Sequence, residues 1–362
     1  MSAPKVLIMA GGTGGHVFPA LALARALRAR DWRIVWLGTR RGLEARLVPA
    51  EQIEVEWLEV GGLRGKGLGK LLAAPFGLLR ALWQALGVMR RQRPDLVVGL
   101  GGYVTGPGGV AAWLCRRALV IHEQNAVAGF TNRCLARLAR QVLVAFPDAF
   151  GAGTEVTLIG NPVRSEITQL AAPADRFATR SGPIRLLVIG GSLGAARLNA
   201  MVPHALAKLA GRLRFEIRHQ AGERGLDAAL ASYREAGVEA SVSAFITDMA
   251  RAYEWADLVI CRAGALTISE LAAAGLASIL VPFPAAVDDH QTRNAEYLVS
   301  AEAAVLIADR ELTAERLSAA LAQLCAGRGR LLAMAERARQ RALPAATAGL
   351  VAACEHWAGA AA

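Results

Sequence analysis

Two short glycine-rich segments have the residue types and spacing that a backbone needs to bind an anion. GGTGGHVFP spans residues 11–19 and GGSLGA spans residues 190–195. Each follows an apolar run typical of a strand and precedes an alanine- and leucine-rich pattern typical of a helix. Glycines let backbone N–H groups approach an anion, and the helix N-terminus adds partial positive charge. Both segments therefore indicate a diphosphate or oxyanion site, and the alternative is a tight strand-to-helix crossover that requires small residues.

The first segment does not fit a dinucleotide. Counted from Gly12, the last glycine of a G-x-G-x-x-G fingerprint falls on Val17, and the next apolar run, RIVWLGTRR, ends in arginines instead of an acidic residue. The sequence also lacks the G-x-x-x-x-G-K-[ST] motif of P-loop proteins and any D-x-D pair. We therefore expect no cofactor and no metal, with arginines and helix N-termini neutralising a leaving diphosphate.

Several polar side chains open a predicted helix or end a predicted strand. His16 stands at a helix start, where the dipole favours a neutral imidazole that serves as general base or as hydrogen-bond donor; a capping or core histidine is the alternative. HEQN follows the apolar run ALVI, so His122, Glu123 and Asn125 are expected at the C-terminal end of a strand, where α/β sheets bind ligands. For Glu123 the alternatives are a loop-structuring role and a rival base.

These side chains lie within a regular alternation of strand and helix patterns. Near-continuous apolar runs separated by helical patterns indicate parallel strands covered on both faces, which predicts an α/β protein. The expected strands are KVLIMA, RIVWLG, DLVVGL, ALVIHE, QVLVAF, RLLVIGG, DLVICRA, ASILVPF and AAVLIA.

The pattern of strand, glycine-rich turn and helix occurs twice, beginning near residues 5 and 184. A chain of 362 residues is long for one hydrophobic core. Residues 161–183 hold three prolines and interrupt the alternation, as a domain connection does. We predict two Rossmann-like doubly wound domains that face each other across a cleft, residues 1–162 and 163–340. We also expect a C-terminal helix near residues 341–362 to pack back on the first domain.

The composition is that of a folded protein, with 54% hydrophobic and 20% charged residues. The formal net charge is +11, but only four of the 41 basic residues are lysines, a bias that codon composition explains as well as function does. The five cysteines include no C-x-x-C pair, and no signal peptide precedes the first expected strand, which indicates a reducing cytoplasm. No run approaches the roughly 18 apolar residues of a membrane span.

One stretch combines basic and apolar residues without any acidic one. Residues 64–93 contain seven basic residues, and their apolar residues recur at steps of mostly three or four. This basic amphipathic pattern predicts docking on an anionic membrane surface; the alternative is a core-facing helix with its arginines in solvent. Nucleic acid is not an expected partner, because no zinc-finger, RNP or helix-turn-helix pattern accompanies the charge. The apolar residues are Leu68, Leu71, Leu72, Phe76, Leu79, Leu82, Trp83 and Leu86.

Nine motifs in order carry a family resemblance that runs from about Lys5 to Leu298. The sequence resembles the MurG family, bacterial N-acetylglucosaminyltransferases that act on lipid I to make lipid II in peptidoglycan synthesis. The motifs are GGTGGHVFPALALA, WLGT, GLRGKG, GGYVTGPGGVAAW, HEQNAVAGFTNR, GNPVR, GGSLGA, FITDMARAYEWADLVICRAGALTISELAAAGL and DDHQTRNAEYL.

The resemblance implies the GT-B fold, with an acceptor- and membrane-binding N-terminal domain and a UDP-GlcNAc-binding C-terminal domain. It implies inverting transfer of GlcNAc from UDP-GlcNAc to the 4-hydroxyl of MurNAc in undecaprenyl-diphospho-MurNAc-pentapeptide, which is lipid I. Such an enzyme is peripheral at the cytoplasmic face of the inner membrane and serves cell-wall biogenesis, cell shape and division beside other cell-wall synthesis proteins. The alternatives are a UDP-sugar epimerase of related fold and a non-catalytic nucleotide-sugar-binding scaffold.

The resemblance also implies a role for individual side chains. His16 stands at a catalytic position on the acceptor side, and Glu123 is the second candidate catalytic residue, as a rival base. Asn125 would contact the donor sugar, where its amide suits a hydroxyl. Glu270 would accept from both hydroxyls of the ribose, and Arg164 would reach the uridine.

Further positions implied by the resemblance contact the rest of the nucleotide sugar. Ser192 would donate to a phosphate oxygen, the backbone of Ile246 would bind the uracil edge, and Gln291 would hold GlcNAc hydroxyls. Two positions depart from the family pattern: Leu193 stands where glutamine is frequent, and Ala263 stands where some members have serine. The remaining UDP-GlcNAc-binding positions are Thr13, Gly14, Gly15, Ala265, Leu266, Thr267, Ile268 and Ser269.

Overall fold

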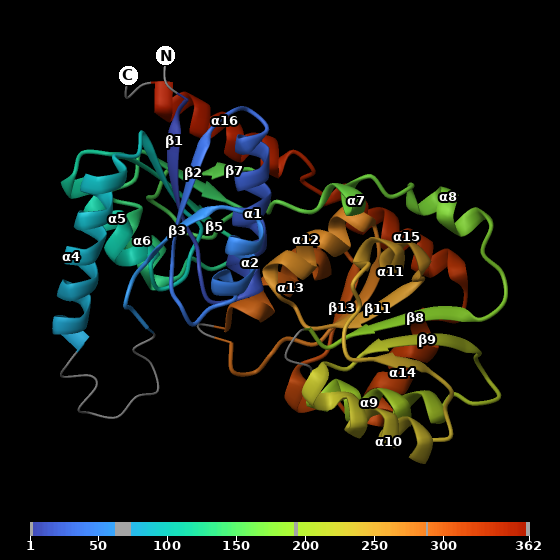
Figure 1. Ribbon diagram of the computed structural model, residues 1–362. Helices are drawn as coiled ribbons and strands as arrows, with labels where there is room; N and C mark the ends of the chain where they lie inside the picture. Colours follow the sequence, from blue (N-terminus) through green and yellow to red (C-terminus); the bar gives the residue numbers. More distant parts are fainter. Residues whose placement is uncertain (1–2, 62–73, 192–194, 287–288, 360–362) are drawn as a thin grey trace. The chain divides into compact units, whose positions relative to one another are not determined.

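The computed structural model describes residues 3–61, 74–191, 195–286 and 289–359, which form two compact units (Figure 1). Unit 1 comprises Met1–Pro162 together with Pro344–Ala362, and unit 2 comprises Val163–Leu343. The chain therefore leaves unit 1 after Pro162 and returns to it at Pro344.

Unit 1 is built on a parallel sheet with the strand order β3-β2-β1-β4-β5-β6-β7. Its strands are β1 (Lys5–Met9), β2 (Arg33–Gly38), β3 (Glu54–Trp57), β4 (Leu96–Gly99), β5 (Ala118–Glu123), β6 (Gln141–Val144) and β7 (Thr157–Leu158). Its helices are α1 (Gly14–Arg28), α2 (Glu44–Ala50), α4 (Ala74–Gln92), α5 (Thr105–Leu114), α6 (Phe130–Leu135) and α16 (Ala346–Gly359).

Unit 2 repeats this architecture with the order β10-β9-β8-β11-β12-β13, again all parallel. Its strands are β8 (Ile184–Ile189), β9 (Phe215–Gln220), β10 (Ser241–Ser243), β11 (Leu258–Cys261), β12 (Ala277–Leu280) and β13 (Ala304–Leu306). Its helices are α7 (Ser165–Thr168), α8 (Pro173–Ala178), α9 (Ala196–Ala207), η1 (Glu223–Gly225), α10 (Leu226–Glu235), α11 (Met249–Trp255), α12 (Ala265–Ala274), α13 (His290–Val299), η3 (Asp309–Glu311), α14 (Ala314–Leu324) and α15 (Arg328–Gln340).

The nine expected strands all form, and the α/β class with doubly wound parallel sheets is confirmed. The apolar pattern misses β3, β7, β9 and β10. Charged residues interrupt β3 (EVEW) and β9 (FEIRHQ), while β7 and β10 are too short for any pattern to appear. Three of the four missed strands, β3, β7 and β10, lie at sheet edges, where one neighbour is absent and burial is incomplete.

Alternate residues of the central strand β1 enter two different cores. Val6 and Ile8 pack in a cluster with α1 and α16, whereas Leu7 and Met9 pack in a cluster with α4 and α5. All four side chains are fully buried, and each contributes roughly 1.5–3 kcal/mol of transfer free energy. The continuous apolar run KVLIM is thus explained by a strand that is covered on both faces.

The proline-containing stretch after Asn161 is not an open linker. It forms the short helices α7 and α8, which belong to unit 2 and pack against α12 and α15 respectively. The change of unit itself occurs between Pro162 and Val163. The proline-containing stretch therefore forms two short helices and is not a flexible connection.

Helix α4 explains both interpretations of the basic amphipathic stretch. Its buried face, which includes Ala85 and Met89, packs beside α5 in a core cluster of unit 1. Phe76, Leu79 and Trp83 lie on another face and are exposed. Residues 64–73 of the stretch lie outside the described residues. Over the described parts of the chain, no helix is both long and apolar enough to cross a bilayer.

The strand order fixes where side chains can gather. In each sheet the order reverses at one point, between β1 and β4 in unit 1 and between β8 and β11 in unit 2. Loops that leave the C-terminal ends of such strands diverge to opposite faces and leave room for a ligand. The glycine-rich segments follow β1 and β8, so both lie at these points.

Candidate active site

The turn after β1 opens helix α1 without a conventional cap. Thr13 is the N-cap residue, but its side chain makes no capping hydrogen bond, and the first turn holds no acidic residue. Thr13, Gly14, Gly15 and His16 therefore form an uncapped helix N-terminus, which carries partial positive charge.

A buried carboxylate that the sequence analysis did not single out supports this turn. Glu44 is fully buried; its Oε2 accepts from the Gly12 backbone N–H at 2.9 Å, and its Oε1 accepts from the backbone N–H and the hydroxyl of Thr39 at 3.0 and 2.7 Å. A Cβ on Gly11 or Gly42 would lie within 2.5 Å of a carboxylate oxygen. In the sequence only Gly38 and Gly42 stand near Glu44, and their spacing does not indicate a buried carboxylate.

The His16 imidazole packs directly against the turn that follows β4. A Cβ on Gly101 would lie 2.4 Å from His16 Nδ1, and a Cβ on Gly102 would lie 2.5 Å from the Gly11 carbonyl oxygen. Both glycines also have positive φ angles, 100° and 90°. These two positions therefore accept only glycine, because a side chain would displace either the imidazole or the neighbouring turn.

His16 is linked by hydrogen bonds to the loop after β5. Its Nδ1 lies 3.1 Å from Gln124 Oε1, and Gln124 Nε2 donates to the Leu100 carbonyl at 2.8 Å and lies 3.2 Å from His122 Nδ1. His122 Nε2 lies 2.9 Å from the Gly160 carbonyl oxygen. His122 is fully buried, and burial lowers its pKa from 6.5 to about 4, so it is neutral near pH 7. The sequence pattern indicates His122 at a strand end, but nothing in it indicates Gln124.

The carboxylate of Glu123 organises the loop that follows it. Its Oε1 accepts from the backbone and side-chain N–H groups of Asn125, and its Oε2 accepts from the Gly129 backbone N–H and the Asn132 side chain. Glu123 is only 3% exposed. A buried carboxylate with its oxygens engaged in this way is poorly placed to take a proton, so the geometry favours the loop-structuring alternative.

Three elements of unit 2 meet at Glu270, which lies on α12. Arg164 at the N-cap of α7 donates to Glu270 Oε1 at 3.1 Å, and Tyr253 on α11 donates its hydroxyl to Glu270 Oε2 at 3.0 Å. Burial raises the pKa of the Glu270 carboxyl, while the Arg164 guanidinium and the Tyr253 hydroxyl oppose that rise. The resemblance pointed to Arg164 and Glu270, and the structure brings them together; Tyr253 was missed.

Helix α12 presents a second uncapped N-terminus. Its N-cap is Gly264, no side chain caps it, and its first turn holds no acidic residue. Its opposite end is closed: Gly275 adopts the left-handed conformation, and Arg176 and Arg339 donate to the carbonyl oxygens of the last turn. Residues Ala265 to Ser269, named from the resemblance, form the start of this helix.

Gln291 and Ile246 lie on other elements of unit 2, Gln291 in the first turn of α13 and Ile246 in a loop. Gln291 Oε1 accepts from the backbone N–H groups of Ala263 and Phe283, and so joins the loops after β11 and β12. Ile246 lies in the loop between β10 and α11. Ser192 and Leu193 lie outside the described residues.

Two family models match most of the chain. Residues 6–144 match the glycosyltransferase family 28 N-terminal domain, and residues 185–348 match the glycosyltransferase family 28 C-terminal domain. The chain belongs to glycosyltransferase family 28. It is therefore a glycosyltransferase: the N-terminal family domain falls in unit 1, and the C-terminal family domain covers most of unit 2 and the first residues after Leu343.

The relatives of this family 28 chain match it over nearly its full length. It is 59% identical over 350 residues to a protein from Alkalilimnicola ehrlichii (96% of this chain, 98% of the relative). It is 56% identical over 350 residues to one from Marinobacter nauticus (97% and 96%). Both are named UDP-N-acetylglucosamine–N-acetylmuramyl-(pentapeptide) pyrophosphoryl-undecaprenol N-acetylglucosamine transferase. The crystal structure of Acinetobacter baumannii MurG is similar with a TM-score of 0.86 at 42% identity, covering 98% of this chain and 99% of that one.

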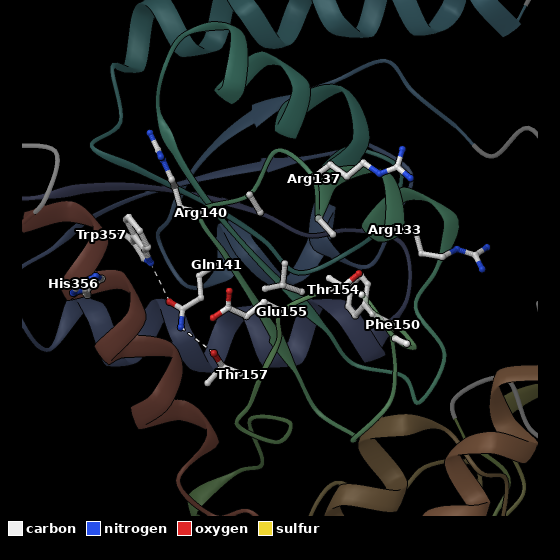
Figure 2. A pocket seen from close by; sticks show the side chains of 15 residues that line it. Arg133, Arg137, Arg140, Gln141, Phe150, Thr154, Glu155, Thr157, His356 and Trp357 are labelled. Atoms are coloured by element: carbon white, nitrogen blue, oxygen red, sulfur yellow. Dashed lines mark hydrogen bonds between the residues drawn. The ribbon is translucent and has the colours of Figure 1, made fainter.

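Unit 1 of the family 28 chain also has a surface hollow that is separate from the candidate active site. It has a volume of about 780 Å³ and lies at the N-terminal ends of β6 and β7, whereas His16 follows the C-terminal end of β1. Figure 2 shows that Arg140 points away from Arg133 and Arg137, while Gln141 bridges Trp357 and Thr157. The arginines do not converge on a common point.

Among the described residues, no group of three His, Cys, Asp or Glu side chains could hold a metal ion.

Proposed function

We propose that this chain transfers GlcNAc from UDP-GlcNAc to the 4-hydroxyl of MurNAc in undecaprenyl-diphospho-MurNAc-pentapeptide, with inversion, to give lipid II. The named activity of relatives that match nearly the whole chain supports this proposal. The structural observation that carries it is the combination, in one family 28 chain, of an imidazole at the open sheet edge of unit 1 and a buried carboxylate behind an uncapped helix in unit 2.

Unit 2 has the groups that a nucleotide diphosphate requires. The first N–H groups of α12, from Ala265 to Ser269, would donate to the diphosphate, and the hydroxyl of Ser192 would add a donor. Each oxygen of Glu270 makes one hydrogen bond and keeps a lone pair for a ribose hydroxyl. Arg164 would contact the uridine, and the backbone of Ile246 would bind the uracil edge.

Two amide side chains would contact the sugar in this proposal. Gln291 would donate its amide N–H groups to GlcNAc hydroxyls, because its oxygen already accepts from two backbone N–H groups. Asn125 would contact the same sugar from the loop that Glu123 holds. Thr13, Gly14 and Gly15 would offer N–H groups of the α1 N-terminus to the nucleotide sugar.

The proposed reaction is a single displacement. His16 takes the proton of the acceptor hydroxyl, whose oxygen forms a bond to the anomeric carbon as the bond from that carbon to UDP breaks. The electron pair of that bond leaves with UDP, whose charge the helix N-terminus and Arg164 stabilise. Glu123 shapes the loop in this scheme and does not act as the base.

A lipid-linked acceptor stays in a bilayer, so the proposal includes docking at the cytoplasmic face of the inner membrane. The exposed Phe76, Leu79 and Trp83 on α4 would enter the anionic interface. Replacing Phe76 and Trp83 by serine should abolish co-sedimentation with vesicles that contain an anionic phospholipid. Leu230→Ser, at an exposed leucine of unit 2, is the matched control and should bind like the parent protein.

The test of the reaction is acceptor-dependent release of UDP. Purified protein is incubated with UDP-GlcNAc, with and without a lipid I analogue, and UDP and a GlcNAc–MurNAc product are measured by mass spectrometry. Release that requires the acceptor supports the proposal. Conversion of UDP-GlcNAc without acceptor would instead indicate an epimerase, and binding without turnover across several acceptor analogues would indicate a scaffold.

A further inference from the structure

A chain of hydrogen bonds in unit 1 starts at backbone carbonyl groups and ends at the His16 imidazole. The first anchor is the Gly160 carbonyl oxygen, 2.9 Å from His122 Nε2. A carbonyl only accepts, so this nitrogen must carry a proton. His122 is fully buried and carries no charged partner within hydrogen-bond distance in the described structure. A neutral imidazole has one N–H, so His122 Nδ1 is bare and accepts.

The second anchor fixes the side-chain amide of Gln124. One end of the amide lies 2.8 Å from the Leu100 carbonyl oxygen and 3.2 Å from His122 Nδ1, and both of these atoms are acceptors. Only the NH₂ end satisfies both contacts, because the opposite orientation would bring two oxygens to 2.8 Å. The oxygen of Gln124 therefore faces His16.

The consequence is a defined proton position on His16. Gln124 Oε1 lies 3.1 Å from His16 Nδ1 and only accepts, so Nδ1 must be the protonated nitrogen. In the neutral ring, Nε2 is then the bare nitrogen. A Cβ at Gly101 would lie 2.4 Å from Nδ1 and would displace the ring from Gln124.

We propose that Gln124 and His122 are positioning residues that hold His16 in the tautomer with its proton on Nδ1 and thereby present Nε2 as the base. This inference rests on the proposed function, in which His16 takes the acceptor proton. In that step the O–H bond of the acceptor breaks and an Nε2–H bond forms, while Nδ1–H keeps its hydrogen bond to Gln124. The resulting imidazolium returns its added proton to solvent after UDP has left.

The test is the nitrogen NMR spectrum of ¹⁵N-histidine-labelled protein near pH 7, with His16 assigned by comparison with a His16→Gln sample. The expected spectrum shows a protonated Nδ1 and a bare Nε2 for His16. Gln124→Met, which removes both hydrogen-bonding atoms, should shift the tautomer ratio and lower kcat about tenfold with little change in UDP-GlcNAc affinity.

His122 and His219 are both fully buried, so the same substitution at each position gives a matched comparison. His122→Gln removes the anchor of Gln124 and should change the His16 signals. His219→Gln removes an equally buried imidazole from unit 2 and should leave them unchanged. A parent protein with the proton on Nε2 of His16 would overturn the inference whatever the activity. If the tautomer is as assigned but His16→Ala retains full turnover, the proposed base is wrong and the tautomer assignment stands.

Discussion

The two units share one strand order but bury carboxylates in opposite ways. In unit 1, Glu44 and Glu123 accept only from N–H and O–H groups, and neither forms an ion pair within the described residues. In unit 2, Glu270 pairs with Arg164, and the fully buried Asp257 pairs with Arg180 and Arg328. Topology therefore does not decide how a buried charge is compensated.

The buried carboxylates of unit 1 shape loops, whereas those of unit 2 pair with cations. Backbone N–H donors come from the loops themselves, so the carboxylates of unit 1 fix loop conformations next to His16. The arginine-paired carboxylates of unit 2 hold cations: Arg180 is buried against Asp257, and the exposed Arg164 lies against Glu270 at the proposed uridine site. We therefore expect unit 1 to be sensitive to hydrogen-bond geometry and unit 2 to be sensitive to charge.

The largest expected effect is on catalysis. It distinguishes the proposed base in unit 1 from the proposed nucleotide-binding carboxylate in unit 2. His16→Ala should lower kcat by about 10²- to 10⁴-fold, because general-base catalysis contributes on that scale, and should leave UDP-GlcNAc affinity nearly unchanged. Glu270→Ala should mainly weaken UDP-GlcNAc binding. Steady-state kinetics and calorimetric titration of each folded variant with UDP-GlcNAc measure the two effects. Equal loss of donor affinity in both variants would erase the proposed division of roles.

The second comparison concerns stability. Asp257→Asn leaves the buried Arg180 without its charge partner and should cost roughly 3–5 kcal/mol of unfolding free energy. Glu44→Gln strands no cation, but it turns an N–H group toward the Gly12 N–H and should cost about 1–3 kcal/mol. Urea titrations provide both values. A larger loss for Glu44→Gln would reverse the contrast drawn between the units.

The third prediction uses a property that both units share, a buried neutral histidine. Burial lowers the pKa of His122 and of His219 from 6.5 to about 4, so the folded state binds fewer protons than the unfolded state below pH 6.5. Stability should therefore fall as the pH drops from 6.5 to 4, by roughly 3 kcal/mol for each histidine. His122→Phe and His219→Phe should each reduce this acid sensitivity, measured as unfolding free energy against pH. A slope that neither substitution changes would contradict the assignment.

The smallest expected effect isolates the charge of Glu270. Burial raises its pKa, so the folded state holds this proton more tightly than the unfolded state, and the carboxyl stabilises the fold less as pH rises above about 4.5. Glu270→Gln should therefore raise the melting temperature slightly at pH 7 and less at pH 5, while donor binding weakens. Scanning calorimetry at both pH values measures the difference. A lower melting temperature at pH 7 would show that the pair with Arg164 is net stabilising.

The sequence predicted the central strands well because they are covered on both faces and consist of apolar runs. It also located the sheet edge that carries His16 and Glu123, since polar residues follow such runs directly. It could not locate Glu44, Gln124 or Tyr253 as site residues. Each of these acts through a partner that is distant in sequence, and a lone glutamate, glutamine or tyrosine in a helix or loop carries no periodic signal.

Helix α16 follows unit 2 in the sequence but belongs to unit 1. Leu350, Val351 and Cys354 complete the core against α1, so unit 1 contains the first and the last residues of the chain. At about 5–20 residues per second, a ribosome needs on the order of 10–40 s to add the residues that follow Pro162. Unit 2 is contiguous and lies entirely before α16 in the sequence. The core around α1 therefore cannot be completed until all of unit 2 has been synthesised.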